Sequence, residues 1–181
     1  RADSPCESSV DMQVYLVPGF FGFTQLGGLR YFLRVADVLG DELSRLGCPA
    51  EIIEVDTKAT SSIRRRALAL CQDVAAHGGL EHGRLHFVGH STGGLDVRLA
   101  LTPGVQLDPG PIEDEIAART RSAISLSTPH FGTPLANVAS SLQGRNLLYL
   151  LPLMATSKTG RAGISRVARM LAALARFDDR F

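Results

Sequence analysis

Ser91 is the residue of this chain whose surroundings best suit nucleophilic chemistry. It is the central residue of the pentapeptide Gly-His-Ser-Thr-Gly at 89–93, with one glycine two positions before it and another two positions after it. An apolar run at 85–88 precedes the pentapeptide, and apolar residues at helical spacing follow it over 95–101. This order predicts a strand, a sharp turn that carries the serine, and a helix, an arrangement called a nucleophile elbow. Because the free N–H groups at a helix start favour negative charge on a nearby oxygen, the stretch suits acyl transfer through a serine hydroxyl.

The elements that must position this serine alternate in type along the chain. Short β-rich runs and segments with apolar residues at helical spacing succeed one another, separated by Gly, Pro and Ser. Alternation of this kind predicts an α/β fold with a mostly parallel sheet, helices on both faces and right-handed crossovers. The expected strands lie at 12–17, 51–55, 85–88 and 122–127, the expected helices at 29–46, 63–77 and 95–101, and a surface loop at 102–113.

Length and charge favour one soluble globular domain. The chain has 181 residues, 45% of them hydrophobic, and a formal net charge of +1. No apolar run reaches the roughly 18 residues that a membrane span needs. Lys and Arg do not recur along a groove-sized surface, which argues against nucleic acid as a partner. The single basic run, Arg64-Arg65-Arg66, is expected to be a solvated helix turn.

The three cysteines, Cys6, Cys48 and Cys71, lack metal-ligand spacing. Cys71 falls on the apolar face of its predicted helix, so we expect it to be buried. A disulfide between Cys6 and Cys48 would fit a secreted protein, but sequence alone does not fix connectivity.

Four histidines, His77, His82, His86 and His90, recur at intervals that invite a zinc interpretation. They cross a helix end, a loop, a strand and the predicted elbow, so they cannot share one helical face. We therefore expect no metal site. His86 is expected to be a core histidine with a hydrogen-bond partner, and His90 only fills the variable position of the elbow.

Two further segments accompany the predicted elbow. The sequence Pro-Gly-Phe-Phe-Gly-Phe at 18–23 follows the first expected strand, and Ser-Thr-Pro-His-Phe-Gly-Thr-Pro at 127–134 follows the fourth. In this order the three motifs resemble the α/β-hydrolase superfamily, and within it bacterial triacylglycerol lipases and related esterases. The resemblance covers roughly residues 12–134. It departs at Pro18, where the lipase pattern usually has His, although Pro-Gly variants occur among lipid acyl hydrolases and acyltransferases.

The resemblance implies a role for each matching residue. Ser91 matches the nucleophile, and the backbone N–H groups of Phe20 and Thr92 match the oxyanion hole that binds the tetrahedral intermediate. Phe21 offers apolar surface to a substrate beside this site. The implied substrate is a carboxylic ester or a lipid, and the chemistry needs no cofactor.

The residues that would activate Ser91 are missing from the pattern. In this fold the acid and then the histidine follow the serine along the chain, and His130 is the only histidine after Ser91. His130 matches the Thr-Pro-His motif, which lines the site in lipases without serving as the base, so its use as the base is a remote alternative. We therefore expect a partial polypeptide in which 1–134 is the N-terminal part of the core. The strands that carry the acid and the histidine would lie outside this sequence or on a second chain.

Residues 135–181 have the character of a helical lid or cap. Apolar residues crowd 147–153, and a basic amphipathic helix is expected to follow. In lipases a lid of this kind opens on a lipid surface, and Leu150 and Leu151 would then line the substrate pocket. An equal alternative is that both segments pack on the core with their arginines in water.

The sequence thus predicts a secreted serine hydrolase of lipase or carboxylesterase type that cleaves a carboxylic ester through an acyl-enzyme on Ser91. Two alternatives stay open. An acyltransferase or thioesterase would use the same elbow, and a non-catalytic α/β-hydrolase fragment would act as a binding module, as the missing base allows.

Overall fold

The computed structural model describes residues 12–19, 32, 34–58, 61–81, 83–107 and 110–133. The chain divides into two compact units, one formed by 1–25 with 29–130 and the other by 26–28 with 131–181. All described helices and strands belong to the first unit. In chain order they are β1 (Met12–Val17), α1 (Val35–Arg45), β2 (Glu51–Glu54), α2 (Ile63–Ala76), β3 (Arg84–His90), α3 (Thr92–Ala100), α4 (Ile112–Arg119) and β4 (Thr120–Leu126).

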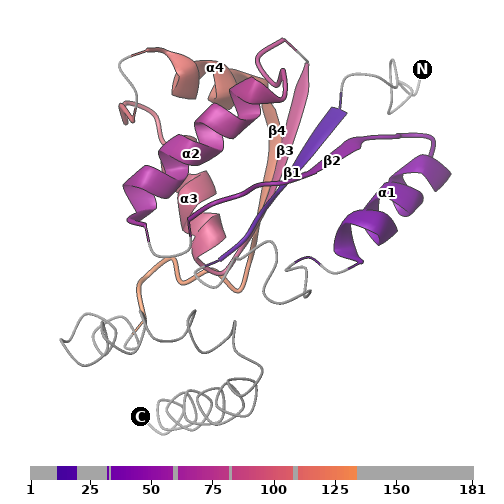
Figure 1. Ribbon diagram of the computed structural model, residues 1–181, viewed down its shortest axis with the longest axis horizontal. Helices are drawn as coiled ribbons and strands as arrows, with labels where there is room; N and C mark the ends of the chain where they lie inside the picture. The colour runs from indigo at the N-terminus through magenta and orange to yellow at the C-terminus, as the bar shows by residue number, and fades with distance from the viewer. Residues whose placement is uncertain are drawn as a thin grey trace, which may run out of the picture. The chain divides into compact units, whose positions relative to one another are not determined.

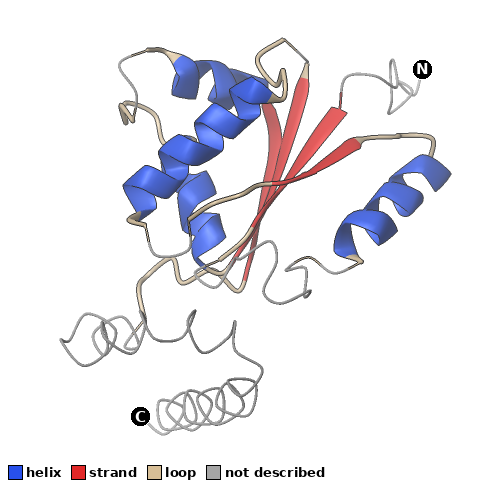
Figure 2. Ribbon diagram, viewed as in Figure 1, coloured by secondary structure: helices blue, strands red, loops and turns tan. Residues whose placement is uncertain are grey.

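The four strands form one parallel sheet in the order β2-β1-β3-β4. Helices α2, α3 and α4 lie on one face and α1 on the other (Figures 1 and 2). The predicted α/β architecture with a parallel sheet is therefore confirmed. Val17 pairs with Gly89, and His90 pairs with Leu126. Because parallel strands end at the same edge, the segments that follow β1, β3 and β4 leave the sheet side by side.

Each face of the sheet has its own apolar core. The larger one lies on the face that α2, α3 and α4 cover, and strand residues at alternate positions point to it. It includes Tyr15, Val17, Ile53, Leu85 and Phe87, which meet Leu70, Val74, Val97 and Ile116 from the helices. The smaller core, under α1, contains Val14, Leu16 and Phe32.

Two helices differ from the sequence prediction. The helix predicted over 29–46 begins only at Val35, because Arg34 has a left-handed backbone with φ of 62°. Helix α4 was not predicted, and it begins within the expected loop. Acidic side chains in its first turn complement the helix dipole, Ile116 is buried in the core, and the buried Glu113 accepts a hydrogen bond from the Leu107 N–H.

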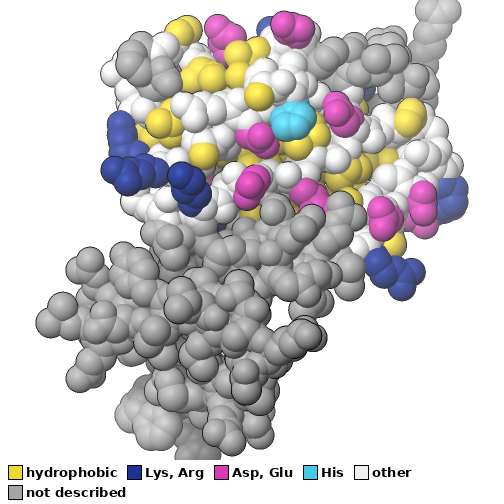
Figure 3. Space-filling view, in the orientation of Figure 1, with side chains coloured by type: hydrophobic (Ala, Val, Ile, Leu, Met, Phe, Trp, Pro, Cys, Tyr) yellow, Lys and Arg dark blue, Asp and Glu magenta, His cyan; other side chains and the backbone are white. Residues whose placement is uncertain are grey.

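Charged side chains are unevenly distributed over the described surface. On the face seen in Figure 3, Lys and Arg side chains gather at both sides of the described part and acidic ones lie scattered between them. Among the described helices none has the length and apolar character needed to span a bilayer. Cys71 is buried, as predicted, and takes part in no disulfide, whereas Cys48 is disulfide-bonded. Its expected partner, Cys6, lies outside the described residues.

Candidate active site

Ser91 occupies the sharp turn between β3 and α3. Strand β3 ends at His90 and α3 begins at Thr92, so a single residue reverses the chain from strand to helix. Ser91 has φ of 55° and ψ of −128°, a conformation that a residue with a side chain adopts only at an energetic cost. Its N–H donates to the Leu126 carbonyl of β4 at 2.8 Å, which helps to hold the strained turn in place. Among the described residues, none forms a hydrogen bond to the Ser91 hydroxyl.

Three glycines let other backbone segments approach this turn more closely than any side chain would permit. A Cβ atom on Gly89 would lie 2.5 Å from Gly94 Cα, and one on Gly93 would lie 2.2 Å from the Val17 carbonyl oxygen. A Cβ atom on Gly94 would lie 2.1 Å from Thr128 Oγ1. The end of β1 and the segment after β4 therefore pack directly against the start of α3. The two segments predicted to accompany the elbow, 18–23 and 127–134, therefore begin on either side of Ser91.

Of the two proposed oxyanion donors, the structure describes Thr92 but not Phe20. Thr92 is the first residue of α3, so its N–H is one of the helix-start donors that lack a partner within the helix. Phe20 and Phe21 lie outside the described residues, as do Leu150 and Leu151. The residues just before Phe20 are described and buried, and the Pro18 carbonyl oxygen would lie 2.7 Å from a Cβ on Gly93. The loop after β1 thus starts against the N-terminal turn of α3.

The prediction of a solvated arginine run is wrong for Arg66. Arg64 and Arg65 are exposed, but Arg66 is 2% exposed and forms a buried ion pair with Asp96 of α3. Its Nε and Nη2 donate to Asp96 Oδ2 at 2.9 and 2.7 Å. The same guanidinium donates to the Pro18 carbonyl at 2.6 Å and to the Gly19 carbonyl at 3.3 Å. One side chain thus joins α2, α3 and the loop after β1.

Asp96 is the partner of this ion pair whose hydrogen bonding is incomplete among the described residues. It is fully buried, and its Oδ1 has no hydrogen-bond partner among the described residues. Burial raises the pKa of Asp96 to about 6, although the hydrogen bond and the charge of Arg66 act to lower that pKa. Thr92 Oγ1, one helical turn earlier, is likewise buried without a partner in the described part of the chain.

Sequence reasoning missed both members of this pair, although a signal existed for Arg66. Arg66 precedes Leu70 by four residues and Val74 by eight, so it falls on the buried stripe of α2. The helical spacing indicated burial, whereas the basic run suggested exposure.

His130, the remote alternative for a base, follows β4 in a segment tied to the elbow helix. Thr128 touches Gly94, and the Arg98 guanidinium donates to the His130 carbonyl at 3.4 Å. The His130 side chain is exposed, and no hydrogen bond joins its ring to Ser91 among the described contacts. The structure brings this segment close to the start of α3, but no histidine or carboxylate among the described residues is hydrogen-bonded to the Ser91 hydroxyl.

The other histidines have separate surroundings. The His86 ring bonds Ser122 Oγ at 2.8 Å; burial lowers its pKa, and the charges of Arg84 and Arg121 lower it further. His86 thus has the partner that was expected. His82 lies outside the described residues. Among the residues that the structure does describe, no three His, Cys, Asp or Glu side chains are grouped to hold a metal ion.

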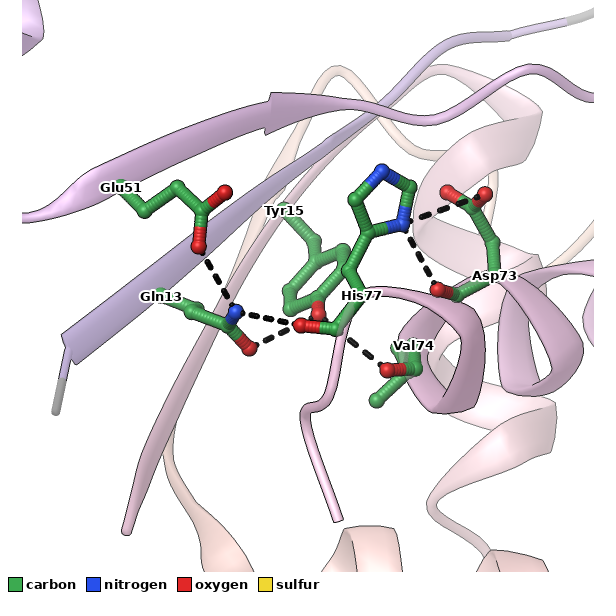
Figure 4. A network of polar contacts seen from close by, with 6 residues as sticks. All are labelled: Gln13, Tyr15, Glu51, Asp73, Val74 and His77. Carbon is green, nitrogen blue, oxygen red and sulfur yellow. Dashed lines mark hydrogen bonds and ion pairs between the residues drawn. The ribbon is translucent and has the colours of Figure 1, made fainter. Parts of the chain in front are cut away.

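A polar network occupies the opposite end of the sheet (Figure 4). Gln13 donates to Glu51 at 2.8 Å and to the His77 carbonyl at 2.8 Å, and the Tyr15 hydroxyl donates to Gln13 at 2.9 Å. The His77 ring lies 3.5 Å from the Asp73 carboxylate. Gln13 and Val17 are four strand residues apart, or roughly 13 Å at the usual rise. This His–Asp pair is therefore too far from the elbow to activate Ser91.

Neither a protein-family model nor a curated protein matches the chain. The interpretation of the site therefore rests on its geometry: a strained serine at a helix start is flanked by the ends of β1 and β4, and a buried arginine joins the loop after β1 to α3.

Proposed function

We propose that this protein is a serine hydrolase of the α/β-hydrolase type that cleaves carboxylic esters through an acyl-enzyme on Ser91. The observation that carries the proposal is the backbone of Ser91, with φ of 55° between β3 and α3. Strain of this kind persists only where the surrounding structure enforces it, and it concentrates at functional sites. The glycine contacts around Ser91 are an enforcing structure of that kind.

The reaction would follow the usual course of acyl transfer. Ser91 Oγ attacks the ester carbonyl carbon while a histidine takes its proton, and the carbonyl oxygen becomes an oxyanion bound by the N–H groups of Phe20 and Thr92. The intermediate collapses, the alcohol leaves with the proton from the histidine, and the acyl group stays on Ser91. Water then repeats the sequence and releases the acid. An acyltransferase would differ only in using another alcohol in place of that water.

The histidine and its carboxylate partner would come from polypeptide outside the described residues. Within the described sheet the outer side of β4 is unpaired, and Ile124 and Leu126 on this strand are 49% and 46% exposed. A further parallel strand along β4 would end at the same edge as β3, beside Ser91. Such a strand, from this polypeptide or from a second chain, is our proposed source of the acid and the base. A lid formed by 135–181, with Leu150 and Leu151 toward the substrate, belongs to the same proposal.

We also propose that the protein is secreted. The disulfide at Cys48 supports this location, because disulfides form and persist in oxidising compartments and are rare in the cytosol. The substrate would then be an extracellular ester or lipid.

Labelling with a fluorophosphonate probe tests the hydrolase directly. The probe phosphonylates a serine only when its hydroxyl is activated, so we expect one adduct on the wild-type protein, mapped to Ser91 by peptide mass spectrometry. Ser91→Ala should abolish the adduct. Ser44→Ala, an exposed serine of α1, is the matched control and should label like the wild type.

No labelling at all in the folded native protein would contradict the proposal and favour a binding module. Labelling of another serine alone would contradict the role of Ser91. A labelled Ser91 combined with turnover of thioesters or with acyl transfer to alcohols, but no ester hydrolysis, would favour the thioesterase or acyltransferase instead.

A further inference from the structure

We propose that Thr128 is a positioning residue for Ser91, because its side chain contacts both of the groups that hold the strained turn in place. The inference rests on the proposed function of Ser91, since it concerns how the Ser91 hydroxyl is presented to a substrate. Thr128 is assigned no contact with the substrate or the reacting atoms. It acts through the backbone on each side of Ser91.

Hydrogen bonds hold the Ser91 backbone on both sides. The Ser91 N–H donates to the Leu126 carbonyl of β4 at 2.8 Å, and the Ser91 carbonyl accepts from the Gly94 N–H at 3.2 Å. Each bond orients one of the two planar peptide groups that flank the Ser91 Cα atom. Because φ and ψ of a residue are set by the orientations of these two groups, Leu126 and Gly94 together enforce the strained conformation of Ser91.

Thr128 contacts both of these bonding partners. Its Oγ1 donates to the Leu126 carbonyl at 3.5 Å, the same oxygen that accepts from the Ser91 N–H. A Cβ atom on Gly94 would lie 2.1 Å from Thr128 Oγ1, 2.8 Å from its Cγ2 and 2.9 Å from its Cβ. The threonine side chain therefore fills the space that a side chain at position 94 would need. Since a hydrogen bond of 3.5 Å is weak, the packing on Gly94 is the stronger of the two contacts.

The segment that carries Thr128 is itself anchored to α3. Ser127 has a left-handed backbone with φ of 50°, which turns the chain sharply after β4 and costs energy in a residue with a side chain. The His130 N–H closes the next turn by donating to the Thr128 carbonyl at 2.9 Å. The Arg98 guanidinium of α3 donates to the His130 carbonyl at 3.4 Å. Thr128 is thus tied to the helix whose first turn it packs against.

A purely structural role for Thr128 is the weaker explanation. Its side chain is only partly buried, so little apolar surface is removed from water there. Ser91 and Ser127 both have positive φ and follow the ends of neighbouring strands. Strain of this kind persists only where the surrounding structure enforces it, and it concentrates at functional sites. The contacts of Thr128 join the two strained residues.

The test measures fluorophosphonate labelling of Ser91 and hydrogen exchange of the Ser91 and Gly94 amides by NMR. Thr128→Ala removes the hydroxyl and the methyl group. We expect labelling to slow by about tenfold, less than the 10²-fold that a misplacement of about 1 Å costs, because the bond between Ser91 and Leu126 remains. Exchange of both amides should accelerate. In ester hydrolysis kcat should fall by the same factor, with KM unchanged.

Two conservative variants separate the packing from the hydrogen bond. Thr128→Val keeps the branched shape against Gly94 and loses the hydroxyl, so labelling should stay within about twofold of the wild type, since the lost bond is long. Thr128→Ser keeps the hydroxyl and loses the methyl group, so its labelling rate should fall between those of Thr128→Val and Thr128→Ala. If Thr128→Ala does not fold, the comparison of these two variants decides by the same criteria.

Thr120→Ala is the matched control for loss of stability. Thr120 lies at the opposite end of β4, where its Oγ1 donates to the Ile116 carbonyl at 2.7 Å. The same substitution there also removes a side-chain hydrogen bond, but it touches neither Leu126 nor Gly94. It should lower the melting temperature and leave labelling of Ser91 and exchange of its amide as in the wild type.

Slower labelling together with faster exchange in Thr128→Ala, and neither change in Thr120→Ala, would support the proposal. A folded Thr128→Ala with wild-type labelling or wild-type exchange would overturn it, as would an equal loss of labelling in Thr120→Ala. Labelling that is lost in Thr128→Val but kept in Thr128→Ser would overturn packing on Gly94 as the route. If the wild type itself is not labelled at Ser91, the proposed hydrolase fails, and the exchange of the two amides alone decides whether Thr128 positions the turn.

Discussion

The two ends of the parallel sheet hold their polar groups in different ways. At the end where β1 begins, Gln13, Tyr15 and Glu51 join β1 to β2 and to the end of α2 through hydrogen bonds of 2.8 to 2.9 Å. At the opposite end, Ser91 has a strained backbone, and Arg66 and Asp96 form a fully buried ion pair. The first arrangement is held by hydrogen bonds, although Asp73 Oδ2 beside it is buried without a partner among the described residues. The second combines backbone strain with a buried ion pair.

This difference supports the proposal that Ser91 lies at the functional end of the sheet. Strain and buried charge each cost stability, and both occur where the ends of β1, β3 and β4 meet. The carboxyl edge of a parallel sheet is also where α/β proteins bind their ligands. The predictions below test whether the two ends respond differently when each is perturbed.

The largest change in stability is expected for Arg66→Met. Removing the guanidinium leaves the Asp96 carboxylate buried without its partner. The free energy of unfolding should therefore fall by about 4 kcal/mol. Urea denaturation measures this cost. At the other end, His77→Ala removes a half-exposed ring beside Asp73, so its cost should be below about 1 kcal/mol. Equal losses of unfolding free energy in the two variants would contradict the difference between the two ends of the sheet.

Gly93→Ala is expected to damage both stability and function. The new Cβ would lie 2.2 Å from the Val17 carbonyl oxygen, so β1 and α3 must separate at a cost of about 3 kcal/mol. Fluorophosphonate labelling of Ser91 should be lost with it. Gly83→Ala, where a Cβ meets nothing within 4 Å, is the matched control. If Gly93→Ala labels and unfolds like Gly83→Ala, the close approach around Ser91 does not exist.

The stability of the elbow end should depend on pH through Asp96. Its folded pKa of about 6 lies above the ordinary value of 3.8. The folded state therefore binds the proton more tightly than the unfolded state, and this contribution is fully present below pH 3.8 and is lost as the pH rises through 6.

We accordingly expect the wild type to gain up to about 3 kcal/mol over Asp96→Asn as the pH falls from 7 toward 4. Urea unfolding of the two proteins at each pH measures the difference, and groups common to both, such as Asp73, cancel. Asp41→Asn, on the exposed side of α1, should show no such trend. A difference between wild type and Asp96→Asn that is flat or opposite in sign would contradict the assignment.

The smallest effect is expected at the other end of the sheet. Tyr15→Phe removes the hydroxyl that donates to Gln13, and the lost hydrogen bond should cost about 1 kcal/mol. Burial, with the charges of Asp73 and Glu51, raises the pKa of this hydroxyl, so it stays protonated and the cost should not vary between pH 5 and 9. Labelling of Ser91 should be unaffected. A change in labelling would mean that the two ends are coupled.

Local patterns predicted most of the fold. The alternation of β-rich and helical segments predicted the parallel sheet, and the helix predicted from residue 63 begins there, where the Ser62 hydroxyl caps it by accepting from the Arg65 N–H. The turn at Ser91 was also predictable, because the requirement for small residues on either side of it is local. Helix α4 was missed because it is short and follows directly on a stretch rich in Pro, Gly and Asp.

The rest of the site depends on contacts between distant residues. Arg66 and Asp96 are 30 positions apart, and nothing in either neighbourhood indicates that the other residue will neutralise its charge. Charged residues are normally exposed, so the basic run suggested a solvated turn. The base that would serve Ser91 remains a prediction for the same reason: its position depends on chain that packs beside β4.

Trapping an acyl-enzyme tests the central claim most directly. The native protein is mixed with a p-nitrophenyl ester, quenched in acid within the burst phase and mapped by peptide mass spectrometry. The account predicts release of p-nitrophenol with the acyl group on Ser91, and no adduct in Ser91→Ala. A folded protein that releases p-nitrophenol while Ser91 stays unmodified, or that carries the acyl group on another residue, would contradict it.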